Sequence, residues 1–161
     1  MALPEDGAFA GVAAFTQLVR DALSAAALDG WTEMVWSDGT FEDWPLRERS
    51  VVDALNQWAQ RGRKLTLLAH RFDALVRLHP RFVEWRVRWD HIIECRVCRG
   101  VGVTEVPSAI WSPQWAMRRL DLVRCTGYSG SEPRSRLLLR EELDERKRQS
   151  GPGFPASVLG L

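Results

Sequence analysis

The chain has 161 residues and a net charge of +1, from 22 basic and 21 acidic residues. That length suits one domain burying roughly 70% of the surface of its unfolded chain, and the near-zero charge excludes a strong overall field that would draw the protein to polyanions or to a membrane surface. Eight tryptophans are several times ordinary usage, and each buries on the order of 200 Å², so we expect most of them in the core.

The first half of the chain alternates between helix and strand signals. Apolar residues recur at helical spacing from Phe9 to Leu23, and Asp29-Gly30 is typical of a helix end. The Leu-Thr-Leu-Leu run after Lys64 is apolar on both sides, as in a central strand. The predicted elements are a helix (7–28), a strand (31–36), a helix (45–60) and a strand (64–69). We expect the two strands to be parallel neighbours joined by a right-handed crossover.

The stretch from Pro80 to Gly100, PRFVEWRVRWDHIIECRVCRG, fits two geometries. Apolar and charged residues alternate as in a half-buried strand, yet Phe82, Trp85 and Trp89 also fall at helical spacing. One strand of such length would be unusual, which favours a helix up to Trp89 and then a strand. The remaining predicted elements are a helix (72–78), strands (91–98, 109–111 and 122–126), a candidate strand (115–120), a loop (127–133) and a helix (134–148).

Together these elements predict an α/β fold, a single-domain mixed sheet of about five strands flanked by helices. The domain spans residues 1–150, and residues 151–161 form a Pro/Gly tail. We expect this tail to cover an edge of its own sheet in preference to docking on a partner. Its apolar residues are Phe154, Val158, Leu159 and Leu161.

The N-terminus and the cysteines suggest a compartment. The residues before the first helix are acidic, unlike a secretory signal, and no apolar run approaches the roughly 20 residues of a membrane span. An odd number of cysteines, Cys95, Cys98 and Cys125, is typical of reduced thiols. We therefore predict a cytoplasmic protein without a membrane partner.

Cys95 and Cys98 form a Cys-x-x-Cys pair, which can begin a zinc or redox site. A closed zinc site needs four ligands, usually from a second such pair. Residues three apart on a strand also point to opposite faces, so one thiol would face the core and the other would not. We predict no metal and no cofactor, and take both residues as ordinary small residues at a strand end.

The order of the elements and three segments carry a resemblance to a known fold. The segments DWPLRERSVVDAL (43–55), HPRFVEWR (79–86) and HIIECR (91–96) are similar to a group of uncharacterised bacterial proteins. That group resembles one half of the phospholipase D-like fold. The superfamily's activity depends on a His-x-Lys pair with a later Asp, in which the histidine attacks a phosphodiester and the lysine stabilises phosphoryl charge.

None of the three histidines, His70, His79 and His91, begins a His-x-Lys motif. The resemblance therefore implies a non-catalytic phospholipase D-like domain, a pseudoenzyme that binds a protein partner or a small anionic ligand. It also implies a homodimer, because single-copy members of the superfamily pair to resemble the two-half enzyme.

The ligand site follows from fold geometry, since ligands of open α/β sheets usually sit beyond the carboxyl ends of the strands. An arginine-bearing cleft at that edge would suit a phosphate or a carboxylate. The predicted ligand-binding residues are Asp38, Trp44, Arg47, His70, Arg71 and Arg99.

Two alternatives stay open. One is an enzyme of unfamiliar mechanism using His70 or His91 as acid or base. The other is a nucleic-acid surface in which arginines neutralise phosphates and Trp85 and Trp89 stack on bases. Its arginines would be Arg81, Arg86, Arg88, Arg96 and Arg99. Acidic residues balance the basic ones almost one for one, so we expect these arginines to be solvated or ion-paired, and we do not expect nucleic acid as a partner.

Overall fold

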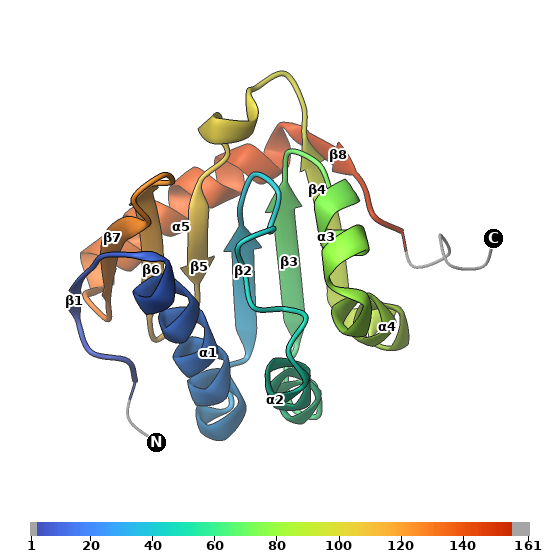
Figure 1. Cartoon of the computed structure of the whole chain (residues 1–161), viewed down its shortest axis with the longest axis horizontal. Coiled ribbons are helices and arrows are strands. Elements are labelled where there is room, and N and C mark those ends of the chain that lie inside the picture. The colour runs from blue at the N-terminus through green and yellow to red at the C-terminus, as the bar shows by residue number, and fades with distance from the viewer. Residues whose placement is uncertain (1–2, 156–161) are drawn as a thin grey trace.

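The computed structural model describes residues 3–155, which form one mixed sheet of eight strands with helices on both of its faces (Figure 1). The α/β class is confirmed, whereas the expected number of about five strands is wrong. The strands are β1 (Gly7–Phe9), β2 (Glu33–Ser37), β3 (Lys64–Ala69), β4 (Ile93–Cys98), β5 (Ser108–Trp111), β6 (Ala116–Asp121), β7 (Thr126–Gly130) and β8 (Ser150–Pro152).

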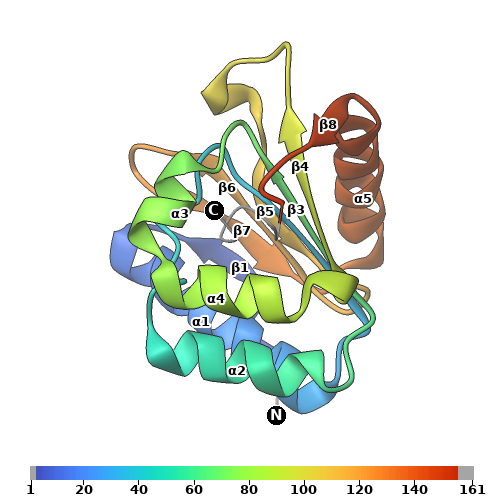
Figure 2. The ribbon, with the colours of Figure 1, turned by 90° about the vertical axis from the view of Figure 1, so that its right-hand side faces the viewer.

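The helices are distributed unequally between the two faces of the sheet. Figure 2 shows α1, α2, α3 and α4 on one side and α5 on the other. The α-helices are α1 (Val12–Asp29), α2 (Arg49–Ala59), α3 (Asp73–Leu78), α4 (Pro80–Arg88) and α5 (Pro133–Arg148), with short 3-10 turns η1 (Asp90–Ile92) and η2 (Val103–Glu105). Within the described part of the chain, no helix is long and apolar enough to cross a membrane.

The sheet has the order β1-β7-β6-β5-β2-β3-β4-β8. Strands β2, β3 and β4 are parallel neighbours, as predicted for the first two, and Leu65 of β3 pairs with Met34 of β2 and with Ile93 of β4. The remaining neighbours are antiparallel. The carboxyl ends of the three parallel strands therefore meet at one edge, where sequence reasoning places the ligand site.

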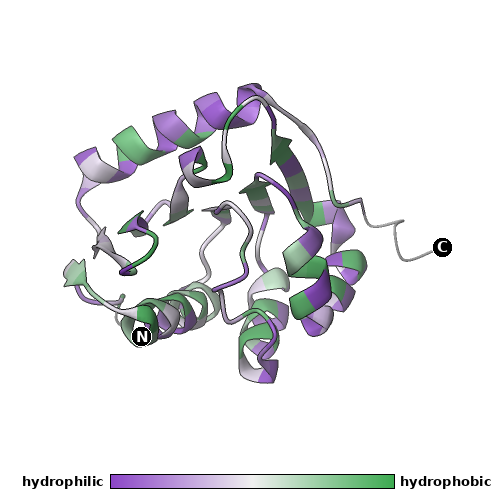
Figure 3. Cartoon of the chain, turned by 45° about the horizontal axis from the view of Figure 1, so that its top comes forward, coloured by the Kyte–Doolittle hydropathy of each residue, from purple (hydrophilic) through white to green (hydrophobic). Residues whose placement is uncertain are grey.

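Aromatic residues fill the layer between the sheet and α1–α4. The Trp58 indole donates a hydrogen bond to the Trp31 carbonyl over 2.6 Å, which ties α2 to the entry of β2. Figure 3 shows that α5, on the other face, is hydrophilic along much of its length. The core location expected for most tryptophans is confirmed, and the fully buried ones are Trp31, Trp36, Trp44, Trp58, Trp85 and Trp115.

Three element predictions fail around strands β1 and β7. The helix predicted from residue 7 begins only at Val12, because residues 7–9 form β1. The strand predicted over 122–126 is wrong: residues 122–125 form a turn, in which the Asp121 carboxylate accepts hydrogen bonds from the backbone of Val123 and Arg124. The loop predicted over 127–133 instead contains most of β7.

The tail covers a sheet edge, as expected. Strand β8 pairs antiparallel with β4, and Phe154 is buried with its ring 5.3 Å from that of Phe72. The Phe154 carbonyl accepts hydrogen bonds from Arg86 Nε and Nη2 at 3.2 and 3.1 Å. The other apolar tail residues named above, Val158, Leu159 and Leu161, lie outside the described residues.

Candidate functional site

The carboxyl edge of the parallel strands brings together part of the predicted ligand site. The Asp38 amide donates to the Leu68 carbonyl and the His70 amide donates to the Gly39 carbonyl, so the ends of β2 and β3 are in contact. The loop between β4 and β5 also reaches this edge, since a Cβ on Gly39 would lie 2.6 Å from the Val103 carbonyl oxygen. Backbone of that loop therefore covers the strand ends.

The six predicted ligand residues have different environments at this edge. Trp44 is fully buried, with its ring 4.8 Å from that of Phe41, and Asp38 is buried in an ion pair. His70 is half-buried. The exposed members are Arg47, Arg71 and Arg99. A joint role of all six in binding one ligand stays a prediction.

Arg119, which sequence reasoning missed, is the centre of a buried polar network at this edge. Its side chain on β6 donates to Asp38 Oδ1 at 2.9 Å, to Asp43 Oδ2 at 3.0 Å and to Ser108 Oγ at 3.1 Å. Its guanidinium also lies 4.2 Å from the centre of the Phe15 ring. Burial would lower the pKa of Arg119, but Asp38 and the hydrogen bonds outweigh it and raise the pKa, so the side chain stays charged.

This network fixes the segment between β2 and α2. Asp38 Oδ2 accepts hydrogen bonds from the backbone of Thr40 and Phe41, and Phe41 holds a left-handed backbone angle of φ 60° while its ring is buried. A non-glycine residue in that conformation costs on the order of 1 kcal/mol. The Asp38 contacts supply part of the compensation, and all three donor nitrogens of Arg119 are occupied, which makes the network structural.

His79 contacts the same segment from the start of α4. It is fully buried, with Nε2 2.9 Å from the Phe41 carbonyl oxygen. Burial lowers the pKa of His79, opposed by this hydrogen bond and assisted by the nearby charge of Arg47. His91 is exposed and packs against Trp89 with the two rings tilted, while His70 lies at the strand ends. The three histidines therefore occupy separate environments.

The lowered pKa of His79 predicts that the protein loses stability in acid. Its pKa in the folded protein lies below the value of about 6.5 expected in the unfolded chain, so the unfolded chain takes up a proton first as the pH falls. The contribution of His79 to the free energy of unfolding is fully present above that pH. Below it, this contribution declines by at most about 1.4 kcal/mol per pH unit. Urea unfolding between pH 7 and 5.5 should show a flatter pH dependence for His79→Gln, which can still donate to Phe41. His91→Gln, on the surface, should keep the wild-type slope, and an unchanged slope in His79→Gln would contradict the assignment.

The two thiols of the Cys-x-x-Cys pair face opposite sides of β4, as predicted: Cys95 packs in the core on the α1–α4 side and Cys98 on the α5 side. Burial raises the pKa of Cys95 to about 11 and also raises that of Cys98. Protonated thiols are poor nucleophiles and poor metal ligands. Among residues 3–155, no group of three metal-binding side chains comes together.

The arginines of the stretch 80–100 are divided between core and surface. Arg86 is buried and forms an ion pair with Asp90 at 2.8 Å, and Arg96 donates to the Ser150 carbonyl at 2.8 Å. Trp85 is only 1% exposed, and Trp89 donates its indole hydrogen to Asn56. Within residues 80–100, the arginines and tryptophans therefore do not form a common exposed surface. On α4 itself, Arg81 and Arg88 alone among the arginines point outward.

Arg81 and Arg88 instead join two arginines of the preceding segment. A groove between α2 and α4 is lined at its rim by Arg49, Arg81 and Arg88, and Arg81 Nη1 donates to the Arg47 carbonyl at 2.9 Å. The groove also contains two carboxylates, Asp53 and Glu84. We call Arg47, Arg49, Arg81 and Arg88 the arginine face. Within the described residues, none of the four forms an ion pair.

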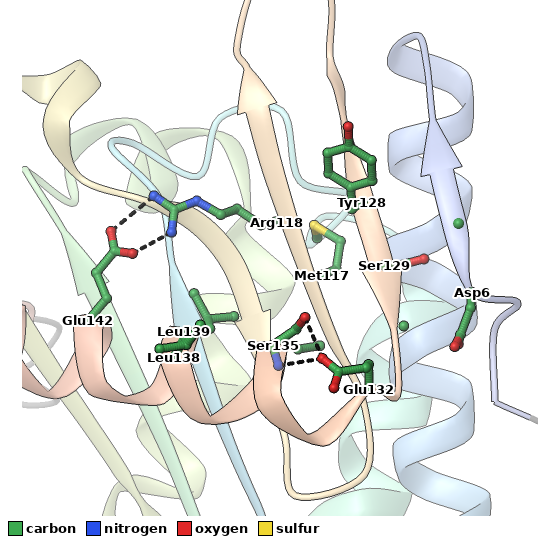
Figure 4. A pocket seen from close by; sticks show the side chains of 13 residues that line it. Asp6, Met117, Arg118, Tyr128, Ser129, Glu132, Ser135, Leu138, Leu139 and Glu142 are labelled. Carbon is green, nitrogen blue, oxygen red and sulfur yellow. Dashed lines mark hydrogen bonds and ion pairs between the residues drawn. The ribbon is translucent and has the colours of Figure 1, made fainter.

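A larger groove lies on the opposite side of the sheet. Figure 4 shows it between α5 and strands β6, β7 and β1, with Leu138 and Leu139 on the helix side and Tyr128 on the sheet side. Its volume is about 550 Å³. Arg118 of β6 and Glu142 of α5 span it with a pair of hydrogen bonds. We call this the α5 groove.

Comparison with known proteins places the fold. No family model matches the chain, and no curated protein matches it in sequence. Among solved structures, that of TrmBL2, an archaeal chromatin protein described as showing a novel mode of DNA binding, superposes with a TM-score of 0.69 at 16% sequence identity. The match covers 95% of this chain but 55% of TrmBL2, so the chain spans about half the length of that protein.

This finding corrects the resemblance drawn from the sequence. The expected membership of a phospholipase D-like group is not supported. The function inferred from that resemblance, a non-catalytic phospholipase D-like domain that binds a small anionic ligand and forms a homodimer, is therefore not supported either. The statement that nucleic acid is not a partner is also overturned, because the structural neighbour is a DNA-binding protein. Over nearly its whole length, the chain has the fold of a part of TrmBL2.

Proposed function

We propose that the chain is a nucleic-acid-binding domain that contacts the phosphate backbone through the arginine face. The observation that carries this proposal is the groove between α2 and α4 lined by Arg49, Arg81 and Arg88, with Arg47 just before α2 in contact with Arg81 through its carbonyl. None of the four arginines forms an ion pair among the described residues. Arginine is well suited to phosphate because its planar group donates two parallel hydrogen bonds. The shared fold with a DNA-binding chromatin protein supports the same function.

The spacing of the arginines suits an extended polyanion. Arg81 and Arg88 lie seven residues apart on α4, which corresponds to about 10.5 Å along the helix axis. Arg49 adds a charge in the first turn of α2, and Arg47 adds one in the segment before it. The two carboxylates in the groove confine contacts with phosphate to its rim. With Trp85 buried, stacking on bases has no platform there. We therefore expect binding that depends on salt and only weakly on sequence.

Charge reversal of two arginines tests the proposal. The double variant Arg81→Glu/Arg88→Glu should bind a fluorescent duplex of about 20 base pairs at least about tenfold more weakly than wild type, because two phosphate contacts become repulsive. The slope of log K against log salt should also fall by about 1.8 in magnitude, since each lost contact contributes about 0.9. Fluorescence anisotropy between about 50 and 200 mM NaCl measures both quantities.

The matched control carries the same charge change elsewhere. Arg124→Glu/Arg134→Glu reverses two exposed arginines, one in the turn between β6 and β7 and one on α5, that also lack an ion pair within the described residues. It should keep the wild-type salt slope. An equal loss in both double variants would show that only net charge matters. Absence of wild-type binding up to about 100 μM, the weak end of ordinary non-specific affinity, would overturn the function itself.

We also propose that the domain works in the cytoplasm. Three free cysteines, Cys95, Cys98 and Cys125, are all buried without forming a disulfide. Reducing compartments preserve such thiols.

A further inference from the structure

The α5 face of the sheet is only half covered by the described residues. Leu139 and Leu143 are the buried side chains of α5, and they pack against residues of β2 to β6 such as Val35 and Ala109. Beyond them, Tyr128 of β7 is 62% exposed and Leu120 of β6 is 57% exposed. Tyr128 pairs with Arg118 in register, and Arg118 reaches Glu142 on α5, so both strands present this face to the α5 side.

The α5 groove occupies this uncovered half. Its walls are apolar: Leu138 of α5 is 52% exposed, and beside it the groove is lined by Leu139, Ala116 and the ring of Tyr128. In Figure 4, Leu138 and Leu139 lie on the α5 side of the opening. A large exposed apolar surface beside a groove marks an interaction site.

The polar rim of the groove is acidic. Asp6 and Glu132 lie at the end where α5 begins, and Glu142 lies farther along the helix, against Arg118, the one cation among the described residues of the lining. Glu132 is fully exposed, and its hydrogen bonds with Ser135 lower its pKa, so it is ionised at neutral pH. Nucleic acid is repelled by such a rim. The occupant must instead be cationic and apolar.

We propose that the α5 groove is the docking site for a cationic amphipathic helix of a protein partner. Helices commonly cover the faces of sheets. A partner helix on this face would pack beside α5, with about 8–10 Å between the two helix axes. A helix laid beside α5 buries Leu138 and Tyr128 with an apolar stripe. Cations at one of its ends meet Asp6 and Glu132. Glu132 and Glu142 are ten residues apart along α5, about 15 Å, so a partner segment of roughly ten residues spans the groove.

Tyr128 makes the docking measurable, because it is the only tyrosine of the chain. Protein labelled with 3-fluorotyrosine gives one ¹⁹F resonance that reports on the groove. The probes are two synthetic helical peptides of about 18 residues with the same leucine stripe, one carrying lysines at one end and the other carrying glutamates there. The lysine peptide should shift the resonance and bind on the order of tenfold more tightly than the glutamate peptide.

Variants of two leucines with nearly equal exposure complete the experiment. Leu138→Glu places a charge in the apolar wall and should abolish the shift, whereas Leu28→Glu on α1, where Leu28 is 51% exposed, should leave it unchanged. The proposal is overturned if the two peptides bind equally, if Leu138→Glu binds the lysine peptide like wild type, or if binding leaves the Tyr128 resonance unmoved. These outcomes are independent of duplex binding by the arginine face, which lies on the other side of the sheet.

Discussion

Replacing Arg119 by methionine should lower the free energy of unfolding by about 3–5 kcal/mol, because a buried charge then loses its partner. The side chain of Asp38 is only 5% exposed, and its ion pair with Arg119 offsets the cost of removing its charge from water. Ser108 and Asp43 lose a donor at the same time. Since small domains are stable by about 5–15 kcal/mol, this single change removes a large part of the total. Urea unfolding followed by tryptophan fluorescence measures it.

The adjacent residue on the same strand provides the control. Arg118 forms a comparable ion pair with Glu142, but both side chains are more than a third exposed, so Arg118→Met should cost at most about 1 kcal/mol. Arg119→Lys keeps the charge but cannot donate in three directions, and should fall between the two. Equal losses in Arg118→Met and Arg119→Met would show that the buried network does not stabilise the fold. If Arg119→Met fails to fold, the stability loss of Arg119→Lys can still be compared with that of Arg118→Met.

Phe154→Ala should cost about 3 kcal/mol, close to the usual loss for a buried phenylalanine. Its ring fills the space between Phe72 and the Arg86 guanidinium, which lies 5.3 Å from the ring centre. Removing the ring leaves a cavity beside a buried charge and loosens the anchor of β8 on β4. Thermal unfolding by calorimetry measures the loss.

The neighbouring proline is the matched control for this variant. Pro155 is exposed, so Pro155→Ala should change stability by no more than about 0.5 kcal/mol. A Phe154→Ala protein as stable as Pro155→Ala would show that the end of the described chain is not part of the core. The backbone of Phe154 is left-handed, with φ 45°, and alanine shares that strain, so the comparison reports on the lost ring.

Local sequence pattern is sufficient for some elements and not for others. The predicted bounds of strand β3 agree with the observed ones, because a short continuous apolar run flanked by polar residues indicates a buried strand. Strand β7, TGYSG, has no such pattern. Its Gly127 is required by close approach, since a Cβ there would lie 1.9 Å from the Arg118 carbonyl oxygen. That requirement comes from a neighbouring strand and is invisible in the segment itself.

The candidate sites depend still more on distant contacts. Arg119 and Asp38 are 81 positions apart, so only the fold shows that they meet, although the alternation of Met117 and Arg119 on one face of β6 is a weak inward signal. Arg81, Arg86 and Arg88 look alike in sequence. Helix geometry separates them, because Arg86 turns toward the carbonyl of Phe154, 68 positions away, while the other two face solvent.

The pairing of β1 has a consequence for the order of folding. Among the described strands, Gly7 to Phe9 form their ladder with β7 alone, and Gly7 pairs with Ser129. During synthesis, β1 therefore cannot pair until β7, which lies far downstream in the chain, has left the ribosome. The β2–β3–β4 unit can assemble from nearby segments long before, since contacts close in sequence form at a lower entropic cost. Strand β1 should thus join the sheet late, and amide hydrogens of β1 should be among the last of the sheet to gain protection from exchange as the nascent chain lengthens.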